Sequence, residues 1–152
     1  MRYVSTRGHD EELNFEEVLL SGLARDGGLY IPKVYPNVSA EEIESFGELS
    51  YQDIAFHIMQ LFTGNTFSDI ELKSMIEMAY SSFNHEAICP LVQLSKDHFL
   101  LELFHGPTLA FKDIAMQIIG QMFHNILGRK KLKATVVAAT SGDTGSAAMA
   151  AF

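Results

Sequence analysis

The hydrophobic and polar positions of the first ninety residues predict several short amphipathic helices. The first helix begins after Asn14, which has the spacing of a capping box with Glu17, and is expected to end at Gly27 and Gly28. A short extended segment over residues 29–32 follows. Three further helices are each predicted by a capping hydroxyl three residues before a carboxylate: Ser39 with Glu42, Ser50 with Asp53, and Ser68 with Glu71.

Apolar spacing within the last two of these helices predicts the faces that they bury. In the helix after Ser50 the predicted core residues are Ile54, Ile58 and Leu61, and Gly64 marks its end. In the helix after Ser68 they are Ile76, Ala79 and Tyr80.

The pattern changes near residue 90. Apolar runs at 91–94 and 99–104 predict strands, and a helix follows from about residue 111, with Gly128 as its stop signal. Its core positions are Ile114, Ile118, Met122 and Ile126. Residues 134–140 have the composition of a buried strand in a parallel sheet, 141–145 form a turn, and 146–152 begin another helix. The expected fold is therefore α/β, with a small, mostly helical domain (1–93) and the incomplete start of a parallel-sheet domain (94–152).

Composition excludes some classes of function. Hydrophobic residues make up 47% of the chain and charged residues 20%, as in globular proteins. The formal charge of −8 argues against nucleic acid as a partner, and the basic run at 129–133 is interpreted as a helix end. The sequence shows neither the ~18 uninterrupted apolar residues of a membrane span nor the apolar core of a signal peptide. A single cysteine, Cys89, and no Cys/His spacing typical of zinc favour a reducing cytoplasm and no metal site.

Lys112 is the first candidate for chemistry. A lysine is usually a solvated surface residue, but Lys112 follows the apolar run 109–111 and a turn at 105–108. It also lies near a predicted helix N-terminus, where the positive end of the helix dipole disfavours an ammonium. This environment suits an amine that attacks a carbonyl or moves protons.

The second candidate is the segment 140–145, Thr-Ser-Gly-Asp-Thr-Gly, between the predicted buried strand and the last helix, with the turn itself at 141–145. Backbone N–H groups at such a junction bind carboxylate or phosphate, and glycine permits close approach. The loop matches neither the Walker motif nor the dinucleotide fingerprint, so an N-capping turn without a ligand is an equal alternative.

Three other residues have structural interpretations. His105, in a turn with Gly and Pro, is interpreted as a histidine with a structural hydrogen bond rather than a general base. Asp113 is interpreted as complementing the helix N-terminus rather than as catalytic. Cys89 is interpreted as a small buried residue rather than a nucleophile.

Longer motifs add a resemblance. The segment 101–113, Leu-Glu-Leu-Phe-His-Gly-Pro-Thr-Leu-Ala-Phe-Lys-Asp, resembles the cofactor-attachment segment of threonine synthases. Residues 139–148, 27–32 and 3–8 resemble other segments of the same family, in the same order and spacing.

The resemblance implies a pyridoxal 5′-phosphate (PLP) enzyme of fold type II that converts O-phospho-L-homoserine and water to L-threonine and phosphate, the last step of threonine biosynthesis. Lys112 would hold PLP in a Schiff base and later shuttle protons. Asp143 would lie near the 3′-oxygen of the cofactor, where related enzymes carry asparagine. Ser141, Gly142, Thr144 and Gly145 would receive the substrate carboxylate.

Two alternatives stay open. The first is another fold type II PLP lyase, such as a threonine dehydratase or a threonine-synthase-like phospholyase. The second is that these 152 residues are a fragment that is inactive alone, because the family's loop for the PLP phosphate is expected beyond Phe152. Uncovered strand edges in such a fragment would favour self-association.

Overall fold

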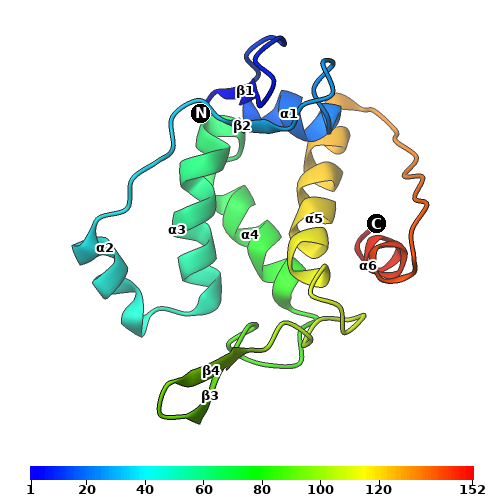
Figure 1. The fold of residues 1–152 in the computed structure, drawn as a ribbon. Coiled ribbons are helices and arrows are strands. Elements are labelled where there is room, and N and C mark those ends of the chain that lie inside the picture. The colour runs from blue at the N-terminus through cyan, green and yellow to red at the C-terminus, as the bar shows by residue number, and fades with distance from the viewer. The chain divides into compact units, whose positions relative to one another are not determined.

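A two-stranded ribbon and short helices make up the first unit, Met1–Lys73, of the computed structural model, which describes all of residues 1–152. Strand β1 (Tyr3–Ser5) pairs antiparallel with β2 (Tyr30–Pro32), and Figure 1 shows both beside α1 (Phe15–Ser21). The capping box of α1 is present as predicted, because Asn14 Oδ1 accepts a hydrogen bond from the Glu17 N–H and the Glu17 carboxylate accepts one from the Asn14 N–H.

The predicted end of α1 is wrong. The helix stops at Gly22, which takes a positive φ of 70° and donates its N–H to the carbonyl of Val18. Gly27 and Gly28 instead form the turn that leads into β2. Gly22 is therefore the stop signal of the helix, and the later glycines serve the ribbon.

Two carboxylates hold the loops of this unit. Asp26 accepts hydrogen bonds from the Ser5 hydroxyl and from the N–H groups of His9 and Gly28. These bonds lower the pKa of Asp26, and the bond from Ser5 has the largest effect. The pKa of Asp10 is lowered chiefly by a hydrogen bond from the Arg25 N–H. Each bond favours the ionised carboxylate.

The three helices predicted by caps begin directly after them, as α2 (Ala40–Ser45), α3 (Tyr51–Thr63) and α4 (Asp69–Tyr80). Two short 3-10 helices, η1 (Phe46–Glu48) and η2 (Gly64–Thr66), were not predicted. Side-chain hydroxyls of Ser39, Ser50 and Ser68 each accept the predicted N–H. α3 ends at Gly64 as expected, and its buried residues are Phe56 and Thr63. The predicted core residues Ile54 and Ile58 are half-buried, whereas Leu61 is 38% exposed, so its assignment to the core was wrong.

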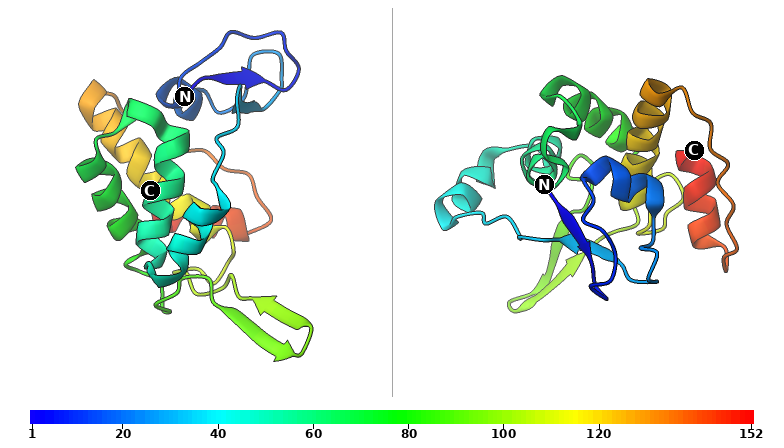
Figure 2. Two further views of the ribbon diagram at one scale, coloured as in Figure 1. Left: turned by 90° about the vertical axis from the view of Figure 1, so that its left-hand side faces the viewer. Right: turned by 90° about the horizontal axis from the view of Figure 1, so that it is seen from above.

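The second unit, Ser74–Phe152, contains the end of α4, a hairpin and two helices. Ile76, Ala79 and Tyr80 are buried as predicted. Strands β3 (Leu91–Ser95) and β4 (His98–Leu101) form an antiparallel hairpin, which extends away from α5 in Figure 2.

Helix α5 (Asp113–Lys130) buries three of its predicted core positions, Ile118, Met122 and Ile126, whereas Ile114 is half-buried. The helix runs past Gly128, so that stop signal was wrong. Lys131 ends it instead, in the left-handed conformation, with its N–H bonded to the carbonyl of Gly128. The basic run does close the helix as predicted, with Arg129 and Lys130 in the last turn.

Helix α6 (Asp143–Ala151) packs against α5. A Cβ on Gly120 of α5 would lie 2.4 Å from the backbone oxygen of Ala151, so the two helices meet at a position that only glycine fits. The rings of Phe123 and Phe152 add an edge contact with centroids 5.7 Å apart.

The predicted parallel sheet is absent from these 152 residues. Both sheets are two-stranded and antiparallel, and residues 132–140 form neither a helix nor a strand. Val137 in this segment is 90% exposed, so the prediction of a buried strand was wrong for this chain. A strand is defined by the neighbour with which it pairs, and these residues have none here.

Both sheet and helix elements are thus present in a small mixed α/β fold. The domain boundary at residues 93/94 stays a prediction. None of the helices has the length and apolar character needed to cross a membrane.

Candidate active site

Lys112 occupies the capping position of α5, directly before Asp113. Its side chain is 27% exposed, and its Nζ lies 4.9 Å from the centre of the Phe111 ring. Phe111 and Leu109 themselves are more than half exposed. The sequence prediction of a lysine at a helix start, flanked by apolar side chains, is confirmed in its geometry.

The first turn of α6 brings a second predicted residue to this lysine. Asp143 Oδ2 lies 3.6 Å from Lys112 Nζ, and the Asp143 side chain is 73% exposed. An exposed ion pair of this kind stabilises a fold by only about 0–1 kcal/mol. The pair therefore orients the lysine amine toward the start of α6 more than it stabilises the fold.

The turn before Lys112 is closed by the buried carboxylate of Asp113, whose exposure is zero. Asp113 Oδ2 accepts a hydrogen bond of 2.8 Å from the Thr108 N–H, and Oδ1 accepts one of 2.6 Å from the Thr108 hydroxyl. The expectation that Asp113 serves the start of α5 is correct in position, but its side chain bonds back to the preceding turn.

Gly106 lies against the same carboxylate. A Cβ at this position would be 2.5 Å from the Asp113 Cβ, which is closer than two such atoms approach. Glycine is thus required by close approach. Leu109, which follows in the turn, has a left-handed φ of 61°, a conformation that costs energy for a residue with a side chain.

His105 has the structural hydrogen bond that the sequence suggested. Its Nε2 lies 2.7 Å from a carboxylate oxygen of Glu102, and both side chains are largely buried. The His85 ring lies 5.0 Å from the His105 ring, centroid to centroid, and the His105 carbonyl accepts the N–H of Asn84. These contacts anchor the segment 102–105, which joins β4 to the turn before Lys112.

The loop 141–145 is shorter than predicted. Ser141 and Gly142 precede α6, whereas Asp143, Thr144 and Gly145 form its first turn. Gly142 is the capping residue and takes a φ of 136°, so the expected need for positive φ is met here.

Thr140 belongs to the candidate segment, but the sequence predicted no role for its hydroxyl. Its hydroxyl accepts hydrogen bonds from the N–H groups of Gly142 (3.0 Å) and Gly145 (3.1 Å). Two amides expected to receive a carboxylate are therefore already bonded within the loop. Both bonds lie outside the usual capping spacing, because the capping residue of α6 is Gly142 and Thr140 bonds to residues two and five positions further on.

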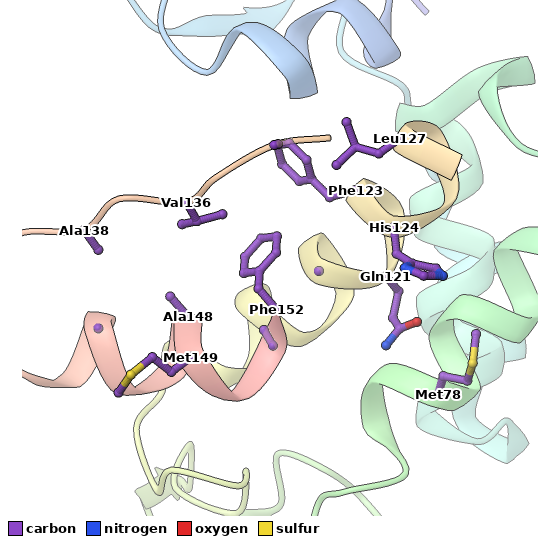
Figure 3. Close-up of a pocket in the computed structure, with 14 residues that line it drawn as sticks. Met78, Gln121, Phe123, His124, Leu127, Val136, Ala138, Ala148, Met149 and Phe152 are labelled. Carbon is purple, nitrogen blue, oxygen red and sulfur yellow. The ribbon is translucent and has the colours of Figure 1, made fainter. Parts of the chain in front are cut away.

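A groove of about 870 Å³ lies between α5, α6 and the extended segment that precedes α6. In Figure 3, Val136 of that segment and Ala148 of α6 lie on opposite sides of it, with Phe152 beside them. Its lining is mainly apolar. Gly145 borders the groove but Lys112 does not, so the groove is separate from the lysine amine.

Comparison with known proteins identifies the family. The family model described as "Threonine synthase N terminus" matches residues 2–80. This chain belongs to the threonine synthase N-terminal family. Threonine synthase of Pseudomonas aeruginosa is 48% identical over 98% of the chain, and that of Schizosaccharomyces pombe is 45% identical over 97%. The chain covers 32% and 30% of these two proteins, about a third of their length.

A solved threonine synthase structure has the same fold. The chain matches a PLP-bound threonine synthase from Brucella melitensis with a TM-score of 0.97 and 50% sequence identity, over 100% of this chain and 33% of that one. The family model ends at residue 80, before Lys112 and the loop 141–145. The roles of these threonine-synthase-like site residues therefore stay predictions.

Proposed function

We propose that this chain is the N-terminal third of a threonine synthase, a PLP enzyme that converts O-phospho-L-homoserine and water to L-threonine and phosphate. The observation that carries the proposal is the approach of Lys112 to Asp143 at 3.6 Å. It joins the two motifs that resemble the threonine synthase site, although they are far apart in the sequence.

The side chains at this place fit PLP. An amine that attaches to an aldehyde must be reachable, and Lys112 is 27% exposed between the starts of two helices. The Phe111 ring beside its Nζ provides an apolar surface against which a flat aromatic ring can lie. When bound, PLP supplies an electron sink that makes protons on the adjacent substrate carbons acidic.

Lys112 has two functions in this proposal. It would hold the cofactor covalently, and its amine, when free, would take up and return protons at the substrate carbons. Asp143 forms an ion pair with the lysine ammonium and would face the 3′-oxygen of the cofactor when PLP is bound. A carboxylate there adds negative charge that the asparagine of related enzymes does not.

The loop 141–145 binds the substrate carboxylate in this proposal. The start of α6 favours an anion through its amides and its dipole, and Ser141 and Thr144 add hydroxyl donors. The carboxylate competes with Thr140 for the amides of Gly142 and Gly145, so Thr140 holds the loop in shape until substrate arrives.

The proposed fold of the whole protein is fold type II. Residues 134–140, which pair with no strand within these 152 residues, would then be a strand of a parallel sheet in the whole protein, in keeping with the exposed valines Val136 and Val137. The domain boundary at 93/94, the cytoplasmic location and the self-association of the isolated 152 residues belong to the same proposal.

Incubating the intact gene product with PLP and O-phospho-L-homoserine tests the function. Threonine and phosphate should form in equal amounts, and Lys112→Ala should abolish both while the protein stays folded. Phosphate release without threonine would favour a threonine-synthase-like phospholyase. Ammonia release from threonine, without reaction of the phosphate ester, would favour a dehydratase.

A further inference from the structure

Asp113 is a buried carboxylate to which the proposed chemistry gives no task. Its exposure is zero, although it directly follows the half-buried Lys112. An acidic residue in the first turn of a helix usually faces solvent and complements the dipole there. Burial of a carboxylate is unfavourable unless hydrogen bonds compensate for the lost water. The burial of Asp113 therefore points to a specific structural task.

The hydrogen bonds of Asp113 reach back across the turn. Both carboxylate oxygens bond to Thr108, one to its N–H and one to its hydroxyl, at 2.8 and 2.6 Å. The Thr108 backbone and side chain are therefore fixed together, and hydrogen bonds to a charged acceptor are stronger than neutral ones. Gly106 completes the contact, because its missing side chain is what lets the turn lie on the carboxylate.

Lys112 lies within the turn of residues 106–113 that these contacts close. The Leu109 N–H bonds to the Gly106 carbonyl, and the Asp113 N–H bonds to the Ala110 carbonyl. On the other side the Lys112 carbonyl accepts the Met116 N–H of α5. The backbone of Lys112 is thus held from both sides. The same contacts maintain Leu109 in its left-handed conformation, which is unfavourable for a residue with a side chain.

We propose that Asp113 is a positioning residue. Through Thr108 and Gly106 it fixes the turn 106–111 on the start of α5, and so determines where the Lys112 amine meets the cofactor aldehyde. This inference rests on the proposed function, because it concerns the attachment of PLP to Lys112. Displacement of a reacting group by about 1 Å can lower its reactivity about a hundredfold, so a turn that holds the amine in place has a measurable effect.

Four variants of the intact gene product separate positioning from mere stability. Thr108→Val is nearly isosteric and removes only the hydroxyl, whereas Thr108→Ser retains it. Asp113→Asn removes the charge of the acceptor. Asp97→Asn changes an exposed acidic residue of the β3–β4 turn and is the control. The PLP dissociation constant and the fraction of chains reduced by borohydride to pyridoxyl-Lys112 are measured well below the unfolding temperature. The unfolding temperature itself is measured without cofactor.

Thr108→Val and Asp113→Asn should each weaken PLP binding about tenfold and lower the labelled fraction at limiting PLP, as expected for loss of a charged hydrogen bond. Thr108→Ser and Asp97→Asn should stay within about twofold of the wild type, which is the scale of a surface change. If Asp113→Asn does not fold, Thr108→Val against Thr108→Ser decides the matter.

The inference is overturned if Thr108→Val and Asp113→Asn lower the unfolding temperature but leave PLP affinity and labelling unchanged. The Asp113 contacts would then serve stability alone. Absence of label on Lys112 in the wild type would overturn the proposed function, and this inference with it. Label on wild-type Lys112 that the variants leave unchanged overturns the positioning role only.

Discussion

Two glycines of α5 give a matched test of the packing between α5 and α6. Gly120 is buried, and a Cβ there would lie 2.4 Å from the backbone oxygen of Ala151. Gly128 is exposed, and a Cβ there would have nothing within 4 Å. Because both glycines lie in α5, Gly→Ala raises the helix propensity at both positions. The two variants differ in what the new Cβ contacts.

The magnitudes follow from these surroundings. Alanine stabilises a helix interior by up to about 1 kcal/mol relative to glycine. Gly128→Ala should therefore be stabilised by up to this amount. Gly120→Ala gains the same term but must displace backbone, and overpacking of this kind costs about 1–3 kcal/mol. The free energies of unfolding of the two variants should therefore differ by about 1–3 kcal/mol, with Gly120→Ala the less stable.

Hydrogen exchange by mass spectrometry on the intact gene product measures the local effect, and thermal unfolding measures the global one. Peptides from α6 should exchange faster in Gly120→Ala, while Gly128→Ala should leave them protected. Equal protection of α6 in both variants, or a more stable Gly120→Ala, would refute the close contact between Gly120 and Ala151.

Three further predictions concern the acidic loops, the start of α6 and the chain alone. The Ser5 hydrogen bond is the main cause of the lowered pKa of Asp26. The ionised Asp26 therefore stabilises the folded protein fully at pH values above the ordinary carboxyl pKa of about 4. This stabilisation is lost as the pH falls through the lowered pKa. Asp26→Asn should therefore flatten the acid limb of a plot of unfolding free energy against pH, and an unchanged limb would contradict this. Gly142→Val or Gly145→Val should weaken the binding of a substrate analogue more than the binding of PLP. Gly142 has a φ of 136°, which valine rarely adopts, and a Cβ at Gly145 would lie 3.0 Å from the Thr140 hydroxyl and crowd the loop. Equal losses of both affinities by calorimetry would assign the loop to the cofactor or to the fold. The 152 residues alone should bind PLP weakly and release no phosphate from O-phospho-L-homoserine, so saturable micromolar binding with turnover would show that they suffice.

The starts of the helices could be predicted from the sequence, because they depend on contacts between residues close together in the chain. The capping residues Asn14, Ser39, Ser50 and Ser68 predicted helix starts because each cap and its partner lie three residues apart. Helix ends were less reliable. Gly22 and Lys131 end their helices through backbone conformation, while the more conspicuous glycines at 27, 28 and 128 do not.

Long-range contacts could not be predicted in the same way. The segment 134–140 has strand composition, but strand formation depends on a neighbour rather than on composition alone. The approach of Asp143 to Lys112 depends on how α6 packs on α5, which Gly120 permits and no local pattern signals. The motifs suggested a shared site through resemblance, and the Asp113–Thr108 bonds that support the lysine became visible only in the structure.

Attachment of the cofactor to Lys112 is the central claim, and reductive labelling tests it directly. The intact gene product is saturated with PLP, reduced with borohydride, digested and mapped by mass spectrometry. The pyridoxyl group is expected on the peptide that contains Lys112, and it should be lost in Lys112→Ala. Stoichiometric label on another lysine, such as Lys96 or Lys130, would contradict the assignment.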